Sequence, residues 1–297
     1  MKRDIAQEIT DQIIDLIETG QANGTWQAPW VTLAGAMPCN AFTGVNYRGI
    51  NTLLLWHANS KYGYTSNRWA TFKRWKSEGY RLTDAKGRGQ PIVFWQRVIK
   101  EDRNTGEIKA FPILKSYVVF NAAHAVSLET GQPFSADDAG AMLPDQPDAD
   151  GDWLDAQTVL DDAGADLIHG GNRACYIPTH DQVHLPMRET FKSLSAYYCT
   201  GYHELAHWTG HATRLGRDLS GRFGSESYAA EELIAELAAA FTAASVGIDP
   251  ITRLDHAKYI TSWLRVLRDD KRAIITAAGH AQRATDYILG HRFPVSE

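Results

Sequence analysis

The chain has 297 residues, of which 44% are hydrophobic and 22% charged, so a globular protein of two domains with a sizeable core is expected. No stretch approaches the roughly 18–20 apolar residues of a membrane-spanning helix, and we expect no membrane association. The three widely spaced cysteines exclude a disulfide scaffold, and the acidic, amphipathic start is unlike a signal peptide. A cytoplasmic protein is therefore expected.

The charge is unevenly distributed along the chain. Residues 1–125 carry 16 Lys/Arg against 10 Asp/Glu, whereas residues 126–297 carry 14 against 25. Six of the nine tryptophans also lie in the basic first part, which indicates an anionic partner there. The stretch 126–150 is acidic and rich in Pro and Gly, as linkers are. We therefore predict domains over 1–125 and 151–297, joined by an acidic linker over 126–150.

The first part has the pattern of an α+β domain. Isoleucines at spacing four predict an amphipathic helix from residue 5 to Gly20. Further helices are predicted over about 51–59 and over 67–77, the second capped by Ser66. Strands rich in β-branched and aromatic residues are predicted over 92–100 and 108–120, with a hairpin turn at Asn104–Gly106.

The second part is predicted to be mainly helical. One helix is expected over 153–168, followed by a strand-like stretch over 174–185 that Pro178 bends. Four more helices are expected over 191–208, 227–246, 254–268 and 270–289.

His203-Glu-Leu-Ala-His207 carries the strongest chemical signal in the sequence. Four residues apart on a helix, the two imidazoles share a face and can both reach one metal ion. Glu204 lies beside them, where it can hold and deprotonate a water molecule that the metal activates. The motif predicts one Zn²⁺ or other divalent ion per chain, with His203 and His207 as ligands and Glu204 as the catalytic base.

A catalytic zinc ion usually takes three protein ligands, so a third is expected downstream. The metzincin pattern HExxHxxGxxH fails because Thr213 stands in place of its last histidine. In the gluzincin arrangement a later helix supplies a glutamate, and the segment Tyr228–Glu236 fits it. Glu232 and Glu236 share one helical face, so Glu232 is the predicted ligand and Glu236 the predicted acceptor for an imidazole N–H.

Other residues near this motif are less specific. Glu231 is interpreted as a solvated charge, with the alternative that it is the ligand in place of Glu232. His211 lies one turn beyond the pair and is a minor candidate for a metal ligand. Three arginines between the two metal-site helices are candidates for attracting DNA: Arg214, Arg217 and Arg222.

The nucleic-acid hypothesis for the first part depends on the distribution of residue types. Six basic residues and no acidic one occur between Glu18 and Glu78. Aromatic rings stack on unpaired bases and Lys/Arg neutralise phosphates, so single-stranded DNA is the expected partner. The alternative is that the tryptophans are core residues and the basic residues a solvated face. The candidate DNA-binding residues are Tyr47, Arg48, Asn51, Trp56, Arg68, Trp69, Lys73, Arg74, Trp75, Lys76, Trp95 and Arg97.

In combination these motifs resemble the ArdC antirestriction family of conjugative plasmids. The resemblance is carried by Trp26–Trp30, Pro38–Asn40, Thr43–Asn51, Ser66–Phe72, Tyr176–Pro178, Asp181–Pro186, His203–Trp208 and Tyr228–Glu236. It implies an N-terminal single-stranded DNA-binding domain and a C-terminal zincin-like metalloprotease domain. It also implies that incoming plasmid DNA is protected from type I restriction in the recipient cell. It assigns no individual DNA-contacting residue.

The expected fold is therefore α+β with two domains, an N-terminal α+β domain and a mainly helical, zincin-like (gluzincin) domain. A protein substrate, such as a component of the host restriction system, is a possible second partner. The strand near Tyr176–Leu185 could align an extended substrate by backbone pairing. One alternative is a non-catalytic protein that coats single-stranded DNA and whose metal is structural. A metal-dependent nuclease is disfavoured, because two histidines and one glutamate around a single ion suit peptide hydrolysis better.

Overall fold

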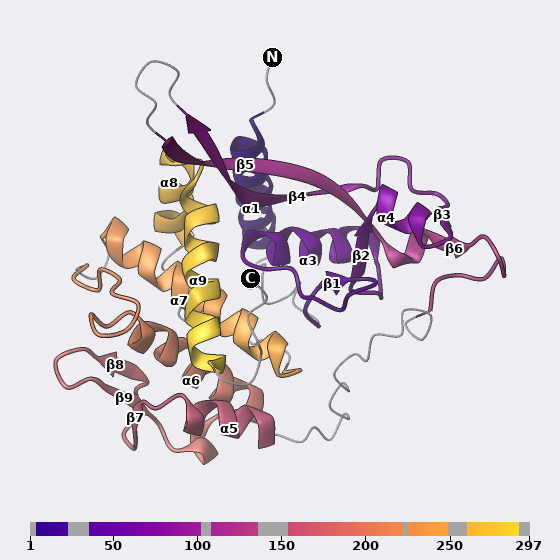
Figure 1. Ribbon diagram of the computed structural model, residues 1–297. Coiled ribbons are helices and arrows are strands. Elements are labelled where there is room, and N and C mark those ends of the chain that lie inside the picture. Colours follow the sequence, from indigo (N-terminus) through magenta and orange to yellow (C-terminus); the bar gives the residue numbers. More distant parts are fainter. Residues whose placement is uncertain are drawn as a thin grey trace. The chain divides into compact units, whose positions relative to one another are not determined.

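The computed structural model describes residues 4–22, 36–101, 108–135, 154–221, 225–248 and 260–290. The chain forms two compact units (Figure 1). Unit 1 comprises Met1–Met37, Arg48–Trp56 and Leu143–Glu297, and unit 2 comprises Pro38–Tyr47 and His57–Met142. These units differ from the contiguous domains expected from the sequence, because the N-terminal segment belongs with the C-terminal part.

Unit 1 is built mainly from helices. They are α1 (Ile5–Ala22), α5 (Leu154–Asp162), α6 (Leu194–Thr209), α7 (Glu226–Ser245), α8 (Ile260–Asp269) and α9 (Ala273–Leu289). The isoleucine face of α1 is buried, and Thr10 Oγ1 donates a hydrogen bond to the Lys271 carbonyl at 2.8 Å. The alanine-rich α7 packs against α6, α8 and α9. Small side chains allow this close helix packing around the centre of the unit.

A small sheet completes the described part of unit 1. Its strand order is β7 (Asp166–His169), β9 (Gln182–Leu185), β8 (Cys175–Ile177), with β9 parallel to β7 and antiparallel to β8. The predicted helix over 153–168 is too long. It ends at Asp162, and Gly164, with φ of +80°, turns the chain into β7. The turn η3 (Arg188–Thr190) precedes α6.

Unit 2 holds the strands predicted in the first part. Its main sheet has the order β1 (Cys39–Asn40), β2 (Arg68–Thr71), β5 (Ile108–Asn121), β4 (Gln90–Glu101). A second pair joins β3 (Tyr80–Leu82) to β6 (Ala125–Ser127), and the helical segments are α4 (Phe72–Ser77) and η1 (Ala122–His124). Helix α3 (Ile50–Tyr62) begins in unit 1 and ends in unit 2. Helices and strands together confirm the α+β class.

Two predictions for this region need correction. Residues 68–71 of the predicted 67–77 helix form β2, and the helix starts at Phe72 with Thr71, not Ser66, as its cap. The Thr71 hydroxyl accepts a hydrogen bond from the Arg74 N–H at 3.2 Å. The predicted linker begins inside β6, while 136–150 and the Asn104–Gly106 turn lie outside the described residues. Among the helices that are described, none has the length and apolar character needed to cross a membrane.

Candidate metal centre

The two helices that carry the predicted ligands start with serine caps. Ser193 Oγ accepts from the Ala196 N–H at the start of α6, and Ser225 Oγ accepts from the Tyr228 N–H at the start of α7. Gly201 lies in α6 although glycine disfavours helices. A Cβ at this position would lie 2.8 Å from Leu160 Cδ2, so the glycine allows a close approach of the α5 side chain. The HExxH helix is thereby fixed against its neighbours.

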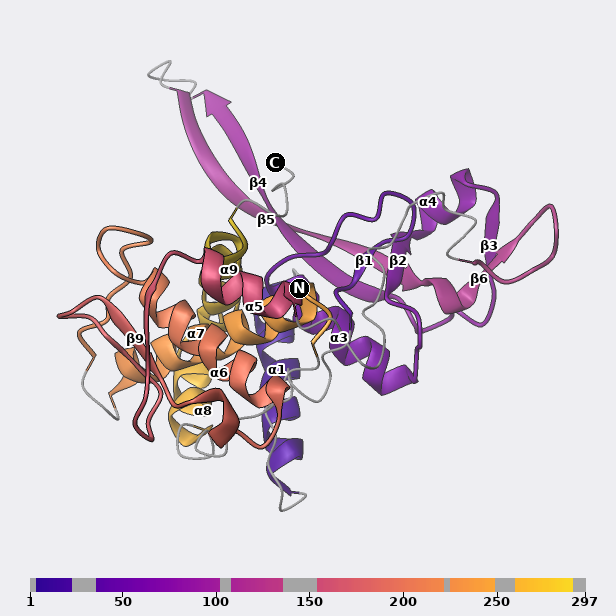
Figure 2. The ribbon, with the colours of Figure 1, turned by 90° about the horizontal axis from the view of Figure 1, so that it is seen from below.

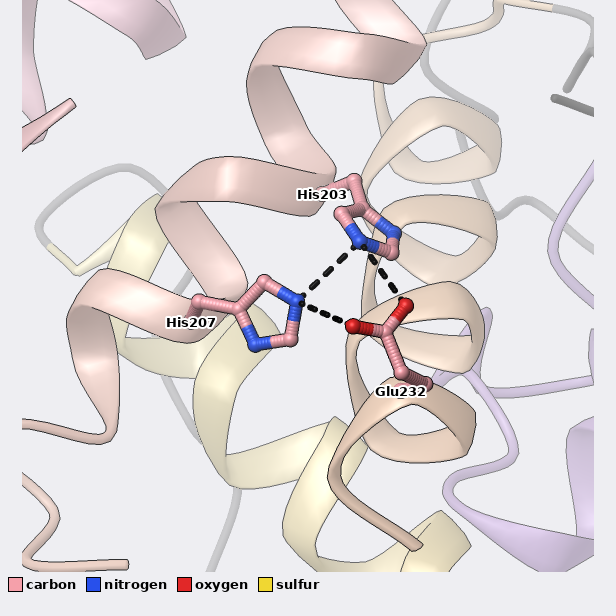
Figure 3. A group of neighbouring side chains, drawn as sticks. All are labelled: His203, His207 and Glu232. Atoms are coloured by element: carbon pink, nitrogen blue, oxygen red, sulfur yellow. Dashed lines mark hydrogen bonds and ion pairs between the residues drawn. The ribbon is translucent and has the colours of Figure 1, made fainter. Parts of the chain in front are cut away.

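His203, His207 and Glu232 converge on one point (Figure 3). The Nε2 atoms of the two histidines on α6 are 3.1 Å apart. The Glu232 carboxylate on α7 approaches them, with oxygens 3.7 Å from His203 Nε2 and 3.6 Å from His207 Nε2. The predicted ligand set is therefore brought together, although its role remains a prediction.

The spacing of these three ligand atoms fits a small divalent ion. Zinc lies about 2.0–2.1 Å from nitrogen and oxygen ligands, and tetrahedral angles then separate the ligand atoms by about 3.3 Å. The observed separations of 3.1, 3.6 and 3.7 Å bracket that distance. Two imidazoles and one carboxylate also leave a fourth position for water, as in hydrolytic sites.

Each histidine is oriented by a second carboxylate on α7. His203 Nδ1 lies 2.5 Å from Glu236 Oε1, and His207 Nδ1 lies 3.2 Å from Glu231 Oε1. Because an ionised carboxylate only accepts hydrogen bonds, both Nδ1 atoms carry the hydrogen. With that hydrogen on Nδ1, Nε2 is the atom through which each ring would bind a metal ion, which would displace any proton there.

The interpretation of Glu231 as a solvated charge is wrong. Glu231 is only 8% exposed. Besides contacting His207, its carboxylate accepts hydrogen bonds from Arg217 Nη2 at 2.8 Å and from Arg217 Nε at 3.0 Å. Arg217 also donates to Thr209 Oγ1 and to the Ala206 carbonyl. Sequence reasoning missed this pair because Arg217 comes from the connection after α6. Gly210 lies close to this arginine, since a Cβ there would lie 3.0 Å from the Arg217 Nη2.

The carboxylates dominate the electrostatics of the site. Glu204, Glu231, Glu232 and Glu236 are all buried. Burial lowers the pKa of His207, but the Glu231 hydrogen bond and the charges of Glu231, Glu232 and Glu204 raise it to about 9. For Glu231, burial raises the pKa, but His207 and Arg217 outweigh that and lower it. The cluster therefore favours a bound cation.

Glu204 is held by the edge of the small sheet. The backbone N–H of Tyr176, on β8, donates to Glu204 Oε2 at 3.0 Å. This contact fixes the carboxylate that the sequence predicts as the base. The pairing of an extended substrate along Tyr176–Leu185 stays a prediction, but the backbone N–H of Tyr176 is already bound to Glu204.

A second buried arginine connects β8 to the end of α6. Arg214 binds Asp181, which accepts the Tyr176 hydroxyl at 2.8 Å, and its Nε donates to the Trp208 carbonyl at 2.7 Å. Burial and Asp181 together raise the pKa of Tyr176 to about 12, so its phenol keeps the proton that it donates. Arg214 pairs with Asp181 and Arg217 with Glu231, so both guanidiniums already have carboxylate partners. That they attract DNA stays a prediction, and Arg222 lies outside the described residues. His211 lies outside the ligand group, with its Nδ1 on Thr213 Oγ1 at 2.9 Å.

Arg217→Met should weaken metal binding about 10- to 100-fold, because the Glu231 that orients His207 would lose its partner. Competition titration with Mn²⁺ or Zn²⁺ measures this change. Arg265→Met is the matched control, since Arg265 forms an exposed ion pair with Glu226. Equal metal affinity in Arg217→Met and Arg265→Met would contradict a positioning role for Arg217.

Most of the aromatic residues predicted to bind DNA are in the core. Trp56, Trp69 and Trp75 are fully buried, so they cannot stack on bases, and these assignments are wrong. The Trp56 indole donates to the Ala36 carbonyl, and that of Trp75 donates to the Phe120 carbonyl. Tyr47 donates its hydroxyl to the Trp69 carbonyl, and burial raises its pKa. For Trp95 the side chain lies outside the described residues.

The polar candidates divide into two groups. Arg68 is buried against the Ala41 carbonyl, which is incompatible with phosphate binding, and Arg48 pairs with Asp286. Asn51 is half-buried in the first turn of α3. Three side chains of α4 are exposed and remain candidates: Lys73, Arg74 and Lys76. Of these, Arg74 pairs with Glu78; the Arg97 side chain lies outside the described residues.

Trp69→Ala is expected to lower the free energy of unfolding by about 3–5 kcal/mol, the usual cost of removing a large buried aromatic side chain. Urea denaturation followed by circular dichroism measures it. Phe72→Ala is the control, because Phe72 is 56% exposed and should change the stability by less than about 0.5 kcal/mol. A stable Trp69→Ala variant that loses only DNA binding would restore the original assignment.

Comparison with known proteins identifies both parts of the chain. A family model for the N-terminal domain of the anti-restriction factor ArdC matches residues 3–120, and one for zincin-like metallopeptidases matches residues 154–280. The uncharacterized protein y4eC of Sinorhizobium fredii is 35% identical over 96% of this chain and 91% of its own length. The DNA primase TraC of Escherichia coli is 34% identical, but the chain spans only 20% of that protein.

Two solved structures share the fold. The metal-free antirestriction protein ArdC from plasmid R388 has a TM-score of 0.77 and 38% identity, covering 96% of this chain and 97% of that one. The Mn(II)-bound form has a TM-score of 0.75 and 34% identity, covering 98% of this chain and 100% of that one. With matches of this extent in both sequence and structure, the chain belongs to the ArdC antirestriction family.

Proposed function

We propose that the chain binds single-stranded DNA and protects incoming plasmid DNA from restriction, and that unit 1 is a zinc-dependent peptide hydrolase. The observation that carries the hydrolase is the convergence of His203, His207 and Glu232, with Glu204 beside them. The antirestriction role is supported by family membership. A bacterial cytoplasm is the proposed location.

The three ligands suit zinc, because imidazole nitrogen and carboxylate oxygen are its common partners in hydrolytic sites. A bound zinc ion supplies Lewis-acid polarisation of the scissile carbonyl and acidifies water. Glu204 accepts the proton of the attacking water and delivers it to the leaving amine. The Tyr176 N–H keeps Glu204 in place during both transfers. His203 and His207 keep their orientation through Glu236 and Glu231.

Transfer of a plasmid carrying type I restriction sites into a restricting recipient tests the function. Wild-type chain supplied in the recipient should raise the yield of plasmid-bearing cells, and Glu204→Gln should lose that effect if hydrolysis is required. Full protection by Glu204→Gln, together with loss in a variant that no longer binds DNA, would instead support the non-catalytic DNA-coating alternative. No protection by the wild type would contradict the antirestriction role.

A further inference from the structure

Strands β4 and β5 form a ribbon that extends well beyond their neighbour β2. The two strands pair from Gln90 opposite Val119 to Glu101 opposite Ile108. Strand β2 pairs with β5 only over Val119–Asn121. From the pair Pro91–Val118 to the hairpin end, no third strand pairs with β4 or β5 among the described residues. The two long paired strands are visible in Figures 1 and 2. We call this part the β4–β5 ribbon.

One face of the ribbon presents stacked aromatic rings to solvent. In an antiparallel pair, directly opposite residues share a face, so Phe94 and Lys115 lie on the same face as Tyr117. The rings of Phe94 and Tyr117 are stacked, with centroids 4.9 Å apart and planes at 22°. Phe94 is 40% and Tyr117 44% exposed, and Ile113 on this face is 40% exposed. Such a group of exposed apolar side chains is typical of a binding surface.

Lys115 brings a positive charge to this face. It lies directly opposite Phe94, and its side chain is exposed.

These features favour unpaired nucleic acid over a protein or a duplex. Aromatic rings bind exposed base faces, and the exposed Lys115 beside them can neutralise a phosphate. A duplex hides its base faces, so it would leave the rings without a partner. We propose that this face of the β4–β5 ribbon is a stacking platform for single-stranded DNA, with bases on Phe94 and Tyr117 and a phosphate on Lys115. This proposal rests on the proposed DNA-binding function. In it, Phe94 and Tyr117 take the base-stacking role that the sequence analysis gave to the buried tryptophans.

Fluorescence anisotropy of the full chain with a labelled 20-nucleotide oligo(dT) tests the platform. Phe94→Ala and Tyr117→Ala should each weaken binding about tenfold, because base stacking contributes about 1–3 kcal/mol per base. Tyr117→Phe keeps the ring and should bind as the wild type does. Lys115→Gln should reduce the slope of log affinity against log salt by about 0.7, the value for one phosphate contact to a single strand.

The control is Leu128→Ala, which removes an exposed apolar side chain after β6, outside both the ribbon and α4. It should bind like the wild type. Wild-type affinity in both ribbon alanine variants, loss in Leu128→Ala instead, or equal affinity for duplex DNA would overturn the platform while leaving DNA binding intact. If the wild type itself fails to bind the oligonucleotide, the proposed DNA-binding function fails, and the platform with it.

Photocrosslinking distinguishes loss of contact from loss of folding. An oligonucleotide containing 5-iododeoxyuridine should crosslink to the wild-type chain within β4 or β5, as mapped by mass spectrometry of the peptides. Circular dichroism should show the same melting curve for the wild type and the ribbon variants. Crosslinks that map only outside β4 and β5 would overturn the proposal even if an alanine variant is unstable.

Discussion

His203→Ala is expected to reduce the bound divalent metal from one ion per chain to a trace, measured by mass spectrometry of the metal content after gel filtration. The substitution removes one of three ligand atoms and leaves Glu236 buried without the imidazole that it contacts at 2.5 Å. The wild-type chain should also melt at a higher temperature when Zn²⁺ is added, because a ligand that binds only the folded state stabilises it by about 4 kcal/mol at a thousandfold excess over its Kd. His203→Ala should show no such shift.

Three glutamates on α7 provide matched comparisons for this experiment. Glu232→Gln should lose most of the metal, since it removes the charge of the third ligand. Glu231→Gln and Glu236→Gln should keep the ion with about 10- to 100-fold lower affinity, because they only orient histidines. Full metal content in Glu232→Gln together with loss in Glu231→Gln would assign the third ligand to Glu231.

The three predicted ligands lie close together because their placement depends on local helical spacing. Positions 203 and 207 share a face of any helix, and Glu232 and Glu236 share another. The sequence could not show that Glu231 is buried, since its burial depends on where the chain after α6 brings Arg217. That path is set by tertiary packing, in which Gly210 leaves room for the guanidinium.

The assignments around Trp69 failed for a related reason. The segment 67–77 begins with residues that suit a helix cap, so local pattern favoured one helix. The strand β2 forms because Trp69 pairs with Asn121, a partner 52 residues later in the chain that no local pattern reveals. A strand buried in a sheet places Trp69 in the core, whereas the predicted helix left it free to stack on bases. Similarly, the isoleucine face of α1 was predictable, but its packing against α8 was not.

Glu204→Gln is expected to keep one metal ion per chain and to slow peptide hydrolysis about a thousandfold, within the range for loss of a general acid–base group. Glutamine has the shape of glutamate and can still accept the Tyr176 N–H, so the helix and the ligands should be undisturbed. What it lacks is the basicity needed to take a proton from water. A peptide library incubated with Zn²⁺-loaded protein, with cleavage read by mass spectrometry, measures the rate and the sequence preference together.

The matched control for Glu204→Gln is Glu226→Gln, at an exposed position in the first turn of α7, which should cleave at the wild-type rate. Equal cleavage by Glu204→Gln and the wild type would remove Glu204 as the base. If the wild type binds its metal but cleaves no peptide, the ion has only a structural role, in which its charge offsets that of the buried carboxylates. The cluster of Glu204, Glu231, Glu232 and Glu236 would then need the cation to offset the cost of burying their charge, and His203→Ala would lower the melting temperature without a catalytic effect.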